Sequence, residues 1–404
     1  MSKKEEAFYG LPEEVKFCKK CVISNQRPSS TVEFKNEKGE KKEVINFSED
    51  GICSACIFHE EKETNIDWKL RDENLKKLLS RFKSKDGSYD VIVPGSGGKD
   101  SAYTAHVLKY HYGMNPLTVT WAPHLYTDIG MKNFQNWMHT GGLDNILYTP
   151  NGKLHREMTR NAFHNLLHPF QPFIVGQRII GPAMAKKFGA KLVMYGENQA
   201  EYGNAIEENS NPIMNMDFFS SENPLKMKFG GVSMEDYIKT NRYTIDDFAP
   251  YILPQREELI DAGIEVHYLG YYLKWDPQEC YYYAVDNTGF ESNPTRTEGT
   301  YSKYSSIDDK IDPFHYLTTL IKFGIGRCTY DAAQEVRNQK MTREEAVYLV
   351  NKYDSEFPSK YFKEFLEYID TSEEEFHKII DEHRSPHLWK KNNDNSWTLK
   401  HTVK

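Results

Sequence analysis

The stretch from Tyr89 to Tyr112, YDVIVPGSGGKDSAYTAHVLKYHY, decides the fold of this chain. Its short apolar run, Val91 to Val93, predicts a buried strand that ends at Pro94-Gly95. A glycine-rich turn follows, and the apolar spacing from Ala102 to Tyr110 predicts a helix. A strand, such a turn and a helix start together form an anion site, because unpaired backbone amides and the helix dipole point at one spot.

The turn itself carries groups that suit a phosphate chain, namely Ser96, Gly97, Gly98, Lys99, Asp100 and Ser101. Lys99 supplies a charge, Ser101 a hydroxyl group, and Asp100 a carboxylate for Mg²⁺. The turn is not the mononucleotide P-loop, because Lys99 is followed by Asp100 and the glycine spacing differs. The string S-G-G-x-D-S resembles the pyrophosphate loop of ATP pyrophosphatases, which cleave ATP to AMP and pyrophosphate while adenylating a substrate. The alternative is an ordinary glycine-rich turn between a strand and a helix.

Composition limits the classes of protein that fit. The 404 residues allow two or three domains, and 51 Lys and Arg against 59 Asp and Glu argue against nucleic acid as the main partner. The N-terminus shows no apolar core of a secretory signal, and no apolar run approaches the roughly 18 residues needed to span a bilayer. We therefore expect a cytoplasmic protein without membrane insertion.

Four of the six cysteines form two C-x-x-C pairs near the N-terminus, Cys18 with Cys21 and Cys53 with Cys56. Each pair can bind one metal ion from a tight turn, so two pairs predict a structural Cys₄ zinc site. The long gap between the pairs is expected to fold as a hairpin of 31–34 with 44–47, which would bring the pairs together. Redox pairs or unligated buried thiols are the alternatives, and His59 is expected at the surface.

Strands and helices alternate from Tyr89 onward, which predicts an α/β fold with a parallel, doubly wound sheet covered on both faces. The strands are expected at Asp90–Val93, Leu117–Trp121, Asn145–Tyr148, Lys191–Tyr195 and Glu265–Leu269. The helices are expected after the glycine-rich turn and at Ile129–Met138, His155–Leu167 and Val175–Lys187. A charged helix that ends near Lys83 is expected to link the sheet to the cysteine-bearing segment.

Ligands of such sheets bind beyond the carboxyl ends of the strands, so two further strand ends matter. After the second strand, the candidates for holding adenosine are Thr120, Trp121 and Asp128. A plain strand end with a helix N-cap at Asp128 is the alternative. After the fourth strand, Gly196 permits a close approach of ligand, Glu197 can bind Mg²⁺ or substrate, and Asn198 is a candidate for the substrate.

The C-terminal half offers two further candidate segments. The polar loop 292–306 would suit a charged or hydroxylated ligand through Arg296, Thr297, Glu298, Tyr301 and Lys303. A solvated loop is the alternative.

In the second segment, Lys322 and Arg327 flank Gly324 and Gly326, and a buried cation there predicts contact with phosphate or carboxylate. A structural ion pair is the alternative. Residues 205–247 are expected to form an irregular insertion with a hinge at Gly230-Gly231, and the tail Lys390–Lys404 is expected to be mobile.

The motifs together resemble those of the N-acetyl-sugar amidotransferases, over about residues 15 to 350. They are the two cysteine pairs, Pro94-Gly-Ser-Gly-Gly-Lys-Asp-Ser101, Tyr195-Gly-Glu-Asn198 and Lys322-Phe-Gly-Ile-Gly-Arg327. The resemblance implies a sheet of the adenine-nucleotide α-hydrolase (pyrophosphate-loop) type. It also implies that ATP and ammonia convert a sugar's acetamido group into an acetamidino group. Such sugars enter bacterial lipopolysaccharide O-antigen or flagellar nonulosonic acid glycans.

The chemistry of this reaction asks for cations and positioning. The amide oxygen would attack the α-phosphate of ATP, and ammonia would then displace AMP. We expect Lys99, Mg²⁺ on Asp100, Lys322 and Arg327 to stabilise the phosphate charge.

Ammonia needs a source, because the chain shows no glutaminase-like cysteine: residue two is Ser2, and neither Cys280 nor Cys328 has the setting of a nucleophile. We therefore predict a separate glutaminase subunit with a cyclase-like partner that supplies ammonia. The sugar substrate is expected to be nucleotide-activated.

The predicted organisation is a zinc module at 1–65, a linking helix at 66–88, a pyrophosphate-loop ATP-binding domain at 89–275, and a substrate loop with a helical region at 276–404. Two other functions fit part of the pattern. A tRNA-thiolating enzyme also adenylates through such a loop, although a basic surface would be expected for it. A non-catalytic ATP-binding module is the third possibility.

Overall fold

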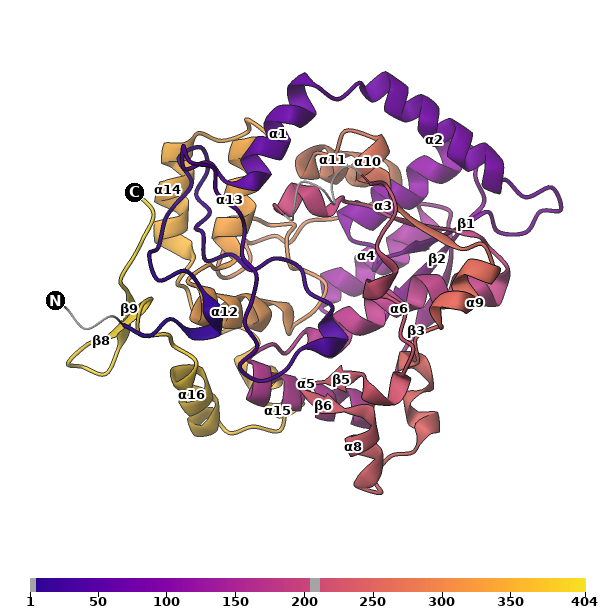
Figure 1. The fold of residues 1–404 in the computed structure, drawn as a ribbon. Helices are drawn as coiled ribbons and strands as arrows, with labels where there is room; N and C mark the ends of the chain where they lie inside the picture. The colour runs from indigo at the N-terminus through magenta and orange to yellow at the C-terminus, as the bar shows by residue number, and fades with distance from the viewer. Residues whose placement is uncertain (1–4, 204–210) are drawn as a thin grey trace.

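The predicted parallel sheet lies at the centre of the computed structural model, which describes residues 5–203 and 211–404 (Figure 1). Its five strands within these ranges are ordered β3-β2-β1-β4-β7 and are all parallel. They are β1 (Val91–Pro94), β2 (Pro116–Trp121), β3 (Asp144–Tyr148), β4 (Leu192–Tyr195) and β7 (Glu265–Tyr268). The strand order reverses between β1 and β4, so the loops after these strands diverge around one crevice. The predicted doubly wound fold is confirmed.

Both faces of the sheet are covered by helices. Successive strand residues point to opposite sides of the sheet, so they belong to two different cores. Ile92 and Val193 belong to a core that includes side chains of α5 (Gly152–Leu166) and α6 (Gln171–Phe188). Val91, Val93 and Met194 belong to a second core on the other side. Its helices are α2 (Trp68–Phe82), α3 (Lys99–His106), α4 (Asp128–His139), α10 (Leu269–Tyr272) and α11 (Pro277–Thr288). A turn of π-helix, η3 (Val107–His111), continues α3.

The N-terminal segment runs beside the C-terminal helices rather than beside the sheet, and α1 (Ser54–Thr64) and α2 bridge the two parts (Figure 1). The predicted hairpin of 31–34 with 44–47 is wrong. The antiparallel pairing instead joins Pro28 to Val44, because residues 33–35 form a 3₁₀ turn, η2 (Glu33–Lys35), that buries Phe34 in the main core. A second short turn, η1 (Phe8–Gly10), precedes it.

The insertion between β4 and β7 is described from residue 211 onward, so positions 205–210 of the prediction lie outside the described residues. It contains short elements packed near α5: η5 (Met216–Phe218), η6 (Pro224–Lys226), β5 (Lys228–Phe229), β6 (Val232–Ser233) and α8 (Met234–Lys239). After it come η7 (Ile245–Tyr251) and α9 (Arg256–Asp261). Gly230 and Gly231 form the two-residue turn of the β5–β6 hairpin, with φ of +62° and +76°, in place of the predicted hinge.

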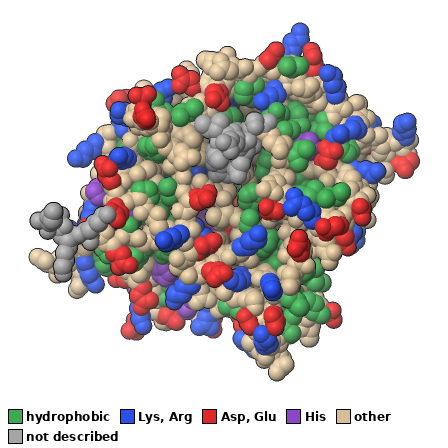
Figure 2. Space-filling view, viewed as in Figure 1, with side chains coloured by type: hydrophobic (Ala, Val, Ile, Leu, Met, Phe, Trp, Pro, Cys, Tyr) green, Lys and Arg blue, Asp and Glu red, His purple; other side chains and the backbone are tan. Residues whose placement is uncertain are grey.

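The C-terminal region is helical, as predicted, and packs against the N-terminal segment (Figure 1). Its helices are α12 (Asp312–Phe323), α13 (Arg327–Arg337), α14 (Arg343–Tyr353), α15 (Phe362–Tyr368) and α16 (Glu373–Glu382). A capping box of Thr342 and Glu345 begins α14. No helix within the described ranges has the length and apolarity to cross a membrane. Figure 2 shows positive and negative side chains interspersed over one face of the molecule.

The tail is ordered by specific contacts, which contradicts the predicted mobility. Strands β8 (Trp389–Lys391) and β9 (Trp397–Leu399) form a hairpin. Trp389 is buried and donates its indole N–H to the carbonyl of Ile321 at 2.8 Å. Val403 is also buried, and its carbonyl accepts a hydrogen bond from Asn351. The tail therefore packs against the C-terminal end of α12.

We expect Trp389→Ala to lower the free energy of unfolding by about 3 to 5 kcal/mol, because it empties a buried indole site and leaves a buried carbonyl without its donor. Urea unfolding would measure the change, with Lys390→Ala on the exposed neighbouring position as control. Equal, small effects of both substitutions would show that the tail contributes nothing to the fold.

Candidate functional site

The glycine-rich loop leaves β1 at the crevice and leads directly into α3. Gly98 is the N-cap of α3, and no side chain of the described residues caps this helix end. The first amides of α3 are therefore available to an anion, and the helix dipole favours one. Ser101 donates its hydroxyl to the carbonyl of Gly98 at 3.1 Å. Ser96 donates to the Asp308 carboxylate at 2.8 Å, which ties the loop to the start of the C-terminal region.

Two of the loop glycines are required by close packing. Gly97 has φ of +82°, and a Cβ there would lie 2.9 Å from the Cα of Phe134 in α4. At Gly95 a Cβ would lie 2.1 Å from the Cβ of Ser101. Any side chain at either position would push the loop away from α4 or from α3.

Lys99 and Asp100 form an ion pair within the loop, with Nζ 2.7 Å and 2.6 Å from the two carboxylate oxygens. Burial disfavours the charged form of Lys99, but the carboxylates of Asp100 and Glu197 outweigh it and raise the pKa of its ammonium group. Burial, followed by the nearby Asp100 carboxylate, raises the pKa of Glu197 to about 7. The hydroxyl of Tyr202 is hydrogen-bonded to Glu197. The crevice thus brings the carboxyl groups of Asp100 and Glu197 close to the Lys99 ammonium group.

Two cavities meet at this group of residues. The first, the loop cavity, has a volume of about 420 Å³ and is lined by the loop, Trp121, Arg178 and Tyr195. The second, the C-terminal cavity, has a volume of about 410 Å³ and is lined by Lys99, Tyr301, Arg327 and Asp331. Both are lined by Asp100, Glu197 and Tyr202. A molecule in one cavity would therefore face a molecule in the other across these three side chains.

Of the three residues predicted to hold adenosine, only Trp121 lines the loop cavity. Trp121 lines the loop cavity and stacks on Tyr148, with ring centroids 5.5 Å apart. Thr120 is buried within the sheet and accepts a hydrogen bond from Asn145, so its predicted ligand contact is not supported. Asp128 is exposed at the start of α4, away from the cavity lining.

The predicted alternative for Asp128 also needs correction, because Thr127 is the N-cap of α4 and accepts from the amide of Gly130. At the end of β4, Gly196 and Glu197 line the loop cavity, as their position after the strand suggested. Asn198 is buried and caps the short helix η4 (Gln199–Tyr202). Its predicted role in substrate binding is therefore not supported by its placement.

The polar loop 292–306 contributes Tyr301 to the C-terminal cavity. Arg296 is held instead by a bidentate ion pair with Glu356, both contacts being 2.6 Å, so the structural alternative applies to it. The remaining predicted residues also lie elsewhere: buried Thr297 donates to the Ser305 carbonyl, Glu298 accepts from Ser359, and Lys303 is exposed. Of the five predicted residues only Tyr301 thus lines the cavity, together with Ser302, Tyr304 and Ser305 of the same loop.

Lys322 and Arg327 point to different cavities, although the sequence suggested a shared anion. Arg327 lines the C-terminal cavity, with Nε 3.1 Å from Asp331, and contacts the Tyr316 hydroxyl. Burial opposes its charge, but Asp331 and its other neighbours outweigh this and raise the pKa of Arg327.

Lys322 lines a separate cavity and donates to the Leu166 carbonyl at 3.0 Å. Burial, with Lys42 nearby, lowers the pKa of Lys322 to about 7. Gly324, with φ of +66°, ends α12 and turns the chain before α13 begins at Arg327. This turn separates the two cations and corrects the predicted joint role at the phosphates.

Sequence reasoning missed three groups that the fold brings to the site: Arg178, Tyr202 and Asp331. Arg178 interrupts the apolar face of α6 and lies over the Tyr195 ring at 5.9 Å. A lone arginine in an apolar helix is a usable signal, since a buried cation needs an anion. Tyr202 and Asp331 carry no local signal, because their roles depend on contacts with Glu197 and Arg327.

The four cysteines of the N-terminal segment converge, as predicted. Their sulfur atoms lie within 4.8 Å of one another, and all four side chains are buried. The Sγ atoms of Cys18 and Cys56 are 3.8 Å apart, as are those of Cys21 and Cys53. One ion bound tetrahedrally by thiolates at about 2.3 Å requires sulfur atoms about 3.8 Å apart. The geometry therefore fits a single ion, since a multi-iron cluster would hold the sulfurs farther apart.

The cysteine module also holds the segment that follows Glu197. Ser54 donates to the Gly203 carbonyl at 2.8 Å. Lys62, in α1, is fully buried and pairs with Glu201 at 2.7 Å, and it also donates to the Trp275 carbonyl. Residues 201–203 are thus bonded to the module on both sides of Tyr202, so the module positions one wall between the two cavities.

Comparison with known proteins identifies the C-terminal region. Residues 298–404 match the family model described as "LPS biosynthesis protein WbpG-like, C-terminal domain". The matched residues include Tyr301, Arg327 and Asp331, which line the C-terminal cavity. An uncharacterised protein of Methanocaldococcus jannaschii is 33% identical over 78 residues, a match that spans 19% of this chain and 27% of that relative.

Three solved structures show more distant likeness. The NH3-dependent NAD synthetase of Campylobacter jejuni is 15% identical with a TM-score of 0.28, covering 34% of this chain and 59% of that one. The NMN synthetase of Francisella tularensis is 12% identical with a TM-score of 0.30, covering 68% and 94%. The U34-tRNA thiolase NcsA of Methanococcus maripaludis, with its 4Fe-4S cluster, is 11% identical with a TM-score of 0.31, covering 76% and 88%.

We expect Lys62→Met to destabilise the protein by about 3 to 5 kcal/mol, because it leaves the buried Glu201 carboxylate without its partner. The double variant Lys62→Met/Glu201→Leu should recover part of this loss, which urea unfolding would measure. Lys69→Met, on the exposed face of α2, is the matched control. A destabilisation that the second substitution only increases would contradict a direct pairing.

Proposed function

We propose that this protein is an ATP-dependent, AMP-forming amidotransferase that acts on an N-acetylated sugar. It would adenylate an acetamido group and convert it with ammonia into an acetamidino group, for bacterial lipopolysaccharide O-antigen or nonulosonic acid glycans. The observation that carries the proposal is the meeting of two cavities at Asp100, Glu197 and Tyr202. One cavity belongs to the glycine-rich loop, and the other is lined by Tyr301, Arg327 and other residues of the WbpG-like domain.

The loop cavity suits ATP. The uncapped amides of α3 and the hydroxyls of Ser96 and Ser101 can bind phosphate oxygens, and Arg178 adds a positive charge. Trp121 offers an aromatic surface on the same cavity wall. ATP would therefore place its α-phosphate toward the C-terminal cavity.

Asp100 and Glu197 are the residues that would hold Mg²⁺, because hard cations prefer carboxylate oxygens and both groups face the two cavities. Bound there, Mg²⁺ would neutralise negative charge on the phosphates. The raised pKa of Glu197, about 7, means that its carboxylate is ionised mainly above neutral pH unless a cation lies nearby.

The C-terminal cavity suits a hydroxylated acceptor. Its lining combines the phenols of Tyr301, Tyr304 and Tyr316 with the Arg327–Asp331 pair, which together donate and accept hydrogen bonds. An acetamido group in this cavity would lie next to the residues that border the loop cavity. Such placement makes the two reactants neighbours, which is the main requirement for the reaction.

The reaction needs no nucleophilic side chain. The acceptor's amide oxygen attacks the α-phosphorus, pyrophosphate leaves, and the amide proton is released, which gives an O-adenylated imidate. Ammonia then adds to the imidate carbon, and AMP leaves with the electron pair of the carbon–oxygen bond. Lys99 and Arg327 are placed to stabilise the phosphate charge. Cys280 and Cys328 are buried, and burial raises the pKa of both thiols, which disfavours the thiolate form.

Ammonia would come from a separate glutaminase subunit with a cyclase-like partner, since none of the described cysteines has a nucleophile's setting. A nucleotide-activated sugar is the proposed acceptor. The test is to incubate the protein with ATP, Mg²⁺, ammonium chloride and a panel of nucleotide-linked acetamido sugars. AMP release together with exchange of oxygen for NH in the sugar, seen by mass spectrometry, would support the proposal.

We expect Asp100→Ala to reduce AMP release by about a hundredfold or more, because the site loses a carboxylate that faces both reactants. Asp286→Ala, on the exposed side of α11, should keep full activity. The metal bound by the four cysteines should be retained in both variants. Retained turnover in Asp100→Ala would contradict the proposed Mg²⁺ site.

The four-cysteine cluster is proposed to bind structural zinc, because its sulfur spacing fits one tetrahedral ion and its buried sulfurs leave no open position. We expect metal analysis to find about one zinc per chain and no acid-labile sulfide. Removal of zinc by a chelator should lower the melting temperature, because the ion stabilises the module. Iron with labile sulfide would contradict this site and favour the tRNA-thiolating alternative.

A further inference from the structure

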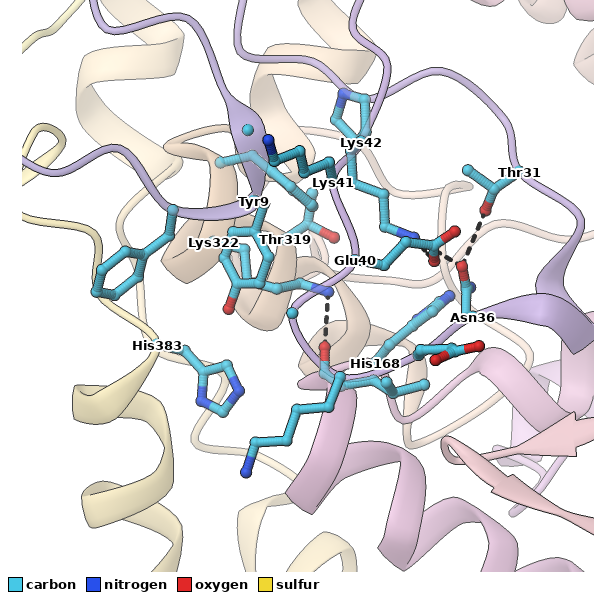
Figure 3. A pocket seen from close by; sticks show the side chains of 18 of the residues that line it. Tyr9, Thr31, Asn36, Glu40, Lys41, Lys42, His168, Thr319, Lys322 and His383 are labelled. Carbon is cyan, nitrogen blue, oxygen red and sulfur yellow. Dashed lines mark hydrogen bonds and ion pairs between the residues drawn. The ribbon is translucent and has the colours of Figure 1, made fainter.

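A third cavity lies between the N-terminal segment and the C-terminal helices (Figure 3). This N-terminal cavity has a volume of about 560 Å³. Figure 3 shows Lys322 of α12 pointing into it, with Lys42 and Glu40 of the N-terminal segment opposite. Neither the loop nor the crevice of the sheet lines it, so the ATP site does not account for it.

The N-terminal cavity shares a wall with the C-terminal cavity. Three residues, His315, Thr319 and Tyr330, line both. His315 and Thr319 are one turn apart on α12, and Lys322 follows on the same helical face. A single layer of side chains therefore separates the N-terminal cavity from the place where the acceptor would react.

A row of acceptor groups leads to this wall. The Glu33 carboxylate lies 3.2 Å from Nε2 of His168, and the His168 ring stacks on His315 with centroids 5.2 Å apart. Burial alone would raise the pKa of Glu33, but His168, Lys42 and Lys322 outweigh it and lower that pKa, so the group is a carboxylate at neutral pH.

The two histidines of the row favour the neutral state. Burial lowers the pKa of both histidines. The Glu33 carboxylate opposes this shift at His168, whereas His168 and Lys322 add to it at His315. Nδ1 of His315 is buried and has no hydrogen-bond partner among the described residues. The Glu33 carboxylate can bind a small cation. The neutral imidazoles that follow can accept hydrogen bonds from the uncharged form of the same molecule.

We propose that the N-terminal cavity is the inlet for ammonia, which would pass the wall at His315, Thr319 and Tyr330 into the C-terminal cavity. This inference rests on the proposed function and names the route of its nitrogen substrate. Ammonium would bind near Glu33 and release one proton to solvent in the N-terminal cavity, so that neutral ammonia passes the wall. Ammonia then forms the carbon–nitrogen bond, two of its hydrogens stay on the amidine, and the third leaves with AMP.

The charges around the wall explain why the passing species is neutral. Arg327 lies beyond the wall, and Lys322 stands before it on the same side as Glu33. A permanent cation would be repelled as it approached Arg327, whereas neutral ammonia would not.

The test blocks the wall by size. Thr319→Phe fills it, and Thr319→Val removes only the hydroxyl at nearly the same volume. AMP release is measured against ammonium chloride at saturating ATP and acceptor sugar. We expect Thr319→Phe to raise the KM for ammonium about tenfold or more, with the KM for ATP changed less than about twofold. Thr319→Val should leave the KM for ammonium within about twofold of the unaltered value.

The outcomes separate the route from the reaction. Absence of ammonium-dependent AMP release in the unaltered protein would refute the proposed function and the route together. Normal release with an unchanged ammonium KM in a folded Thr319→Phe variant would refute the route alone. An equal rise in both Thr319 variants would indicate a hydroxyl contact and would also refute it. If Thr319→Phe fails to fold, Tyr330→Trp narrows the same wall from α13 and is judged by the same criteria.

Discussion

The reversal of strand order between β1 and β4 is the constraint on which the rest of the structure depends. It makes the chain leave two neighbouring parallel strands in opposite directions, so a crevice opens between the loops that follow them. Asp100 comes from one loop and Glu197 from the other, and both border the same two cavities. The cysteine module and the C-terminal region add to a crevice that the sheet already provides. The module bonds the segment 201–203 through Ser54 and Lys62, and the C-terminal region contributes Tyr301 and Arg327.

Electrostatics then determine what the crevice can bind. Burial, and then the nearby Asp100 carboxylate, disfavour the charged form of Glu197 and raise its pKa. Lys99 compensates in part by pairing with Asp100. A divalent cation together with phosphate groups would complete the balance, because the cation satisfies the carboxylates and the uncapped end of α3 satisfies the phosphate.

The cysteine module acts through position rather than chemistry. Its helix α1 places Lys62 against Glu201, while Ser54 binds the Gly203 carbonyl. These contacts fix the short segment that carries Tyr202 and therefore the wall between the cavities. A cysteine cluster far from the loop in sequence thus helps to position the residues between the two cavities. The ordered tail packs against α12, where Trp389 donates a hydrogen bond to the Ile321 carbonyl.

The sequence by itself determined the parallel sheet, the glycine-rich loop between β1 and α3, and the cysteine cluster. Strand patterns, glycine positions and C-x-x-C pairs each depend on a few adjacent residues, so local geometry fixes their meaning. Only the tertiary structure decided which cations face the reaction. Lys322 and Arg327 are five positions apart, yet the turn at Gly324 sends them to different cavities. Arg178 reaches the loop cavity from α6, which packs on the face of the sheet opposite to α3. Such placement depends on how helices pack, and no short stretch of sequence encodes it.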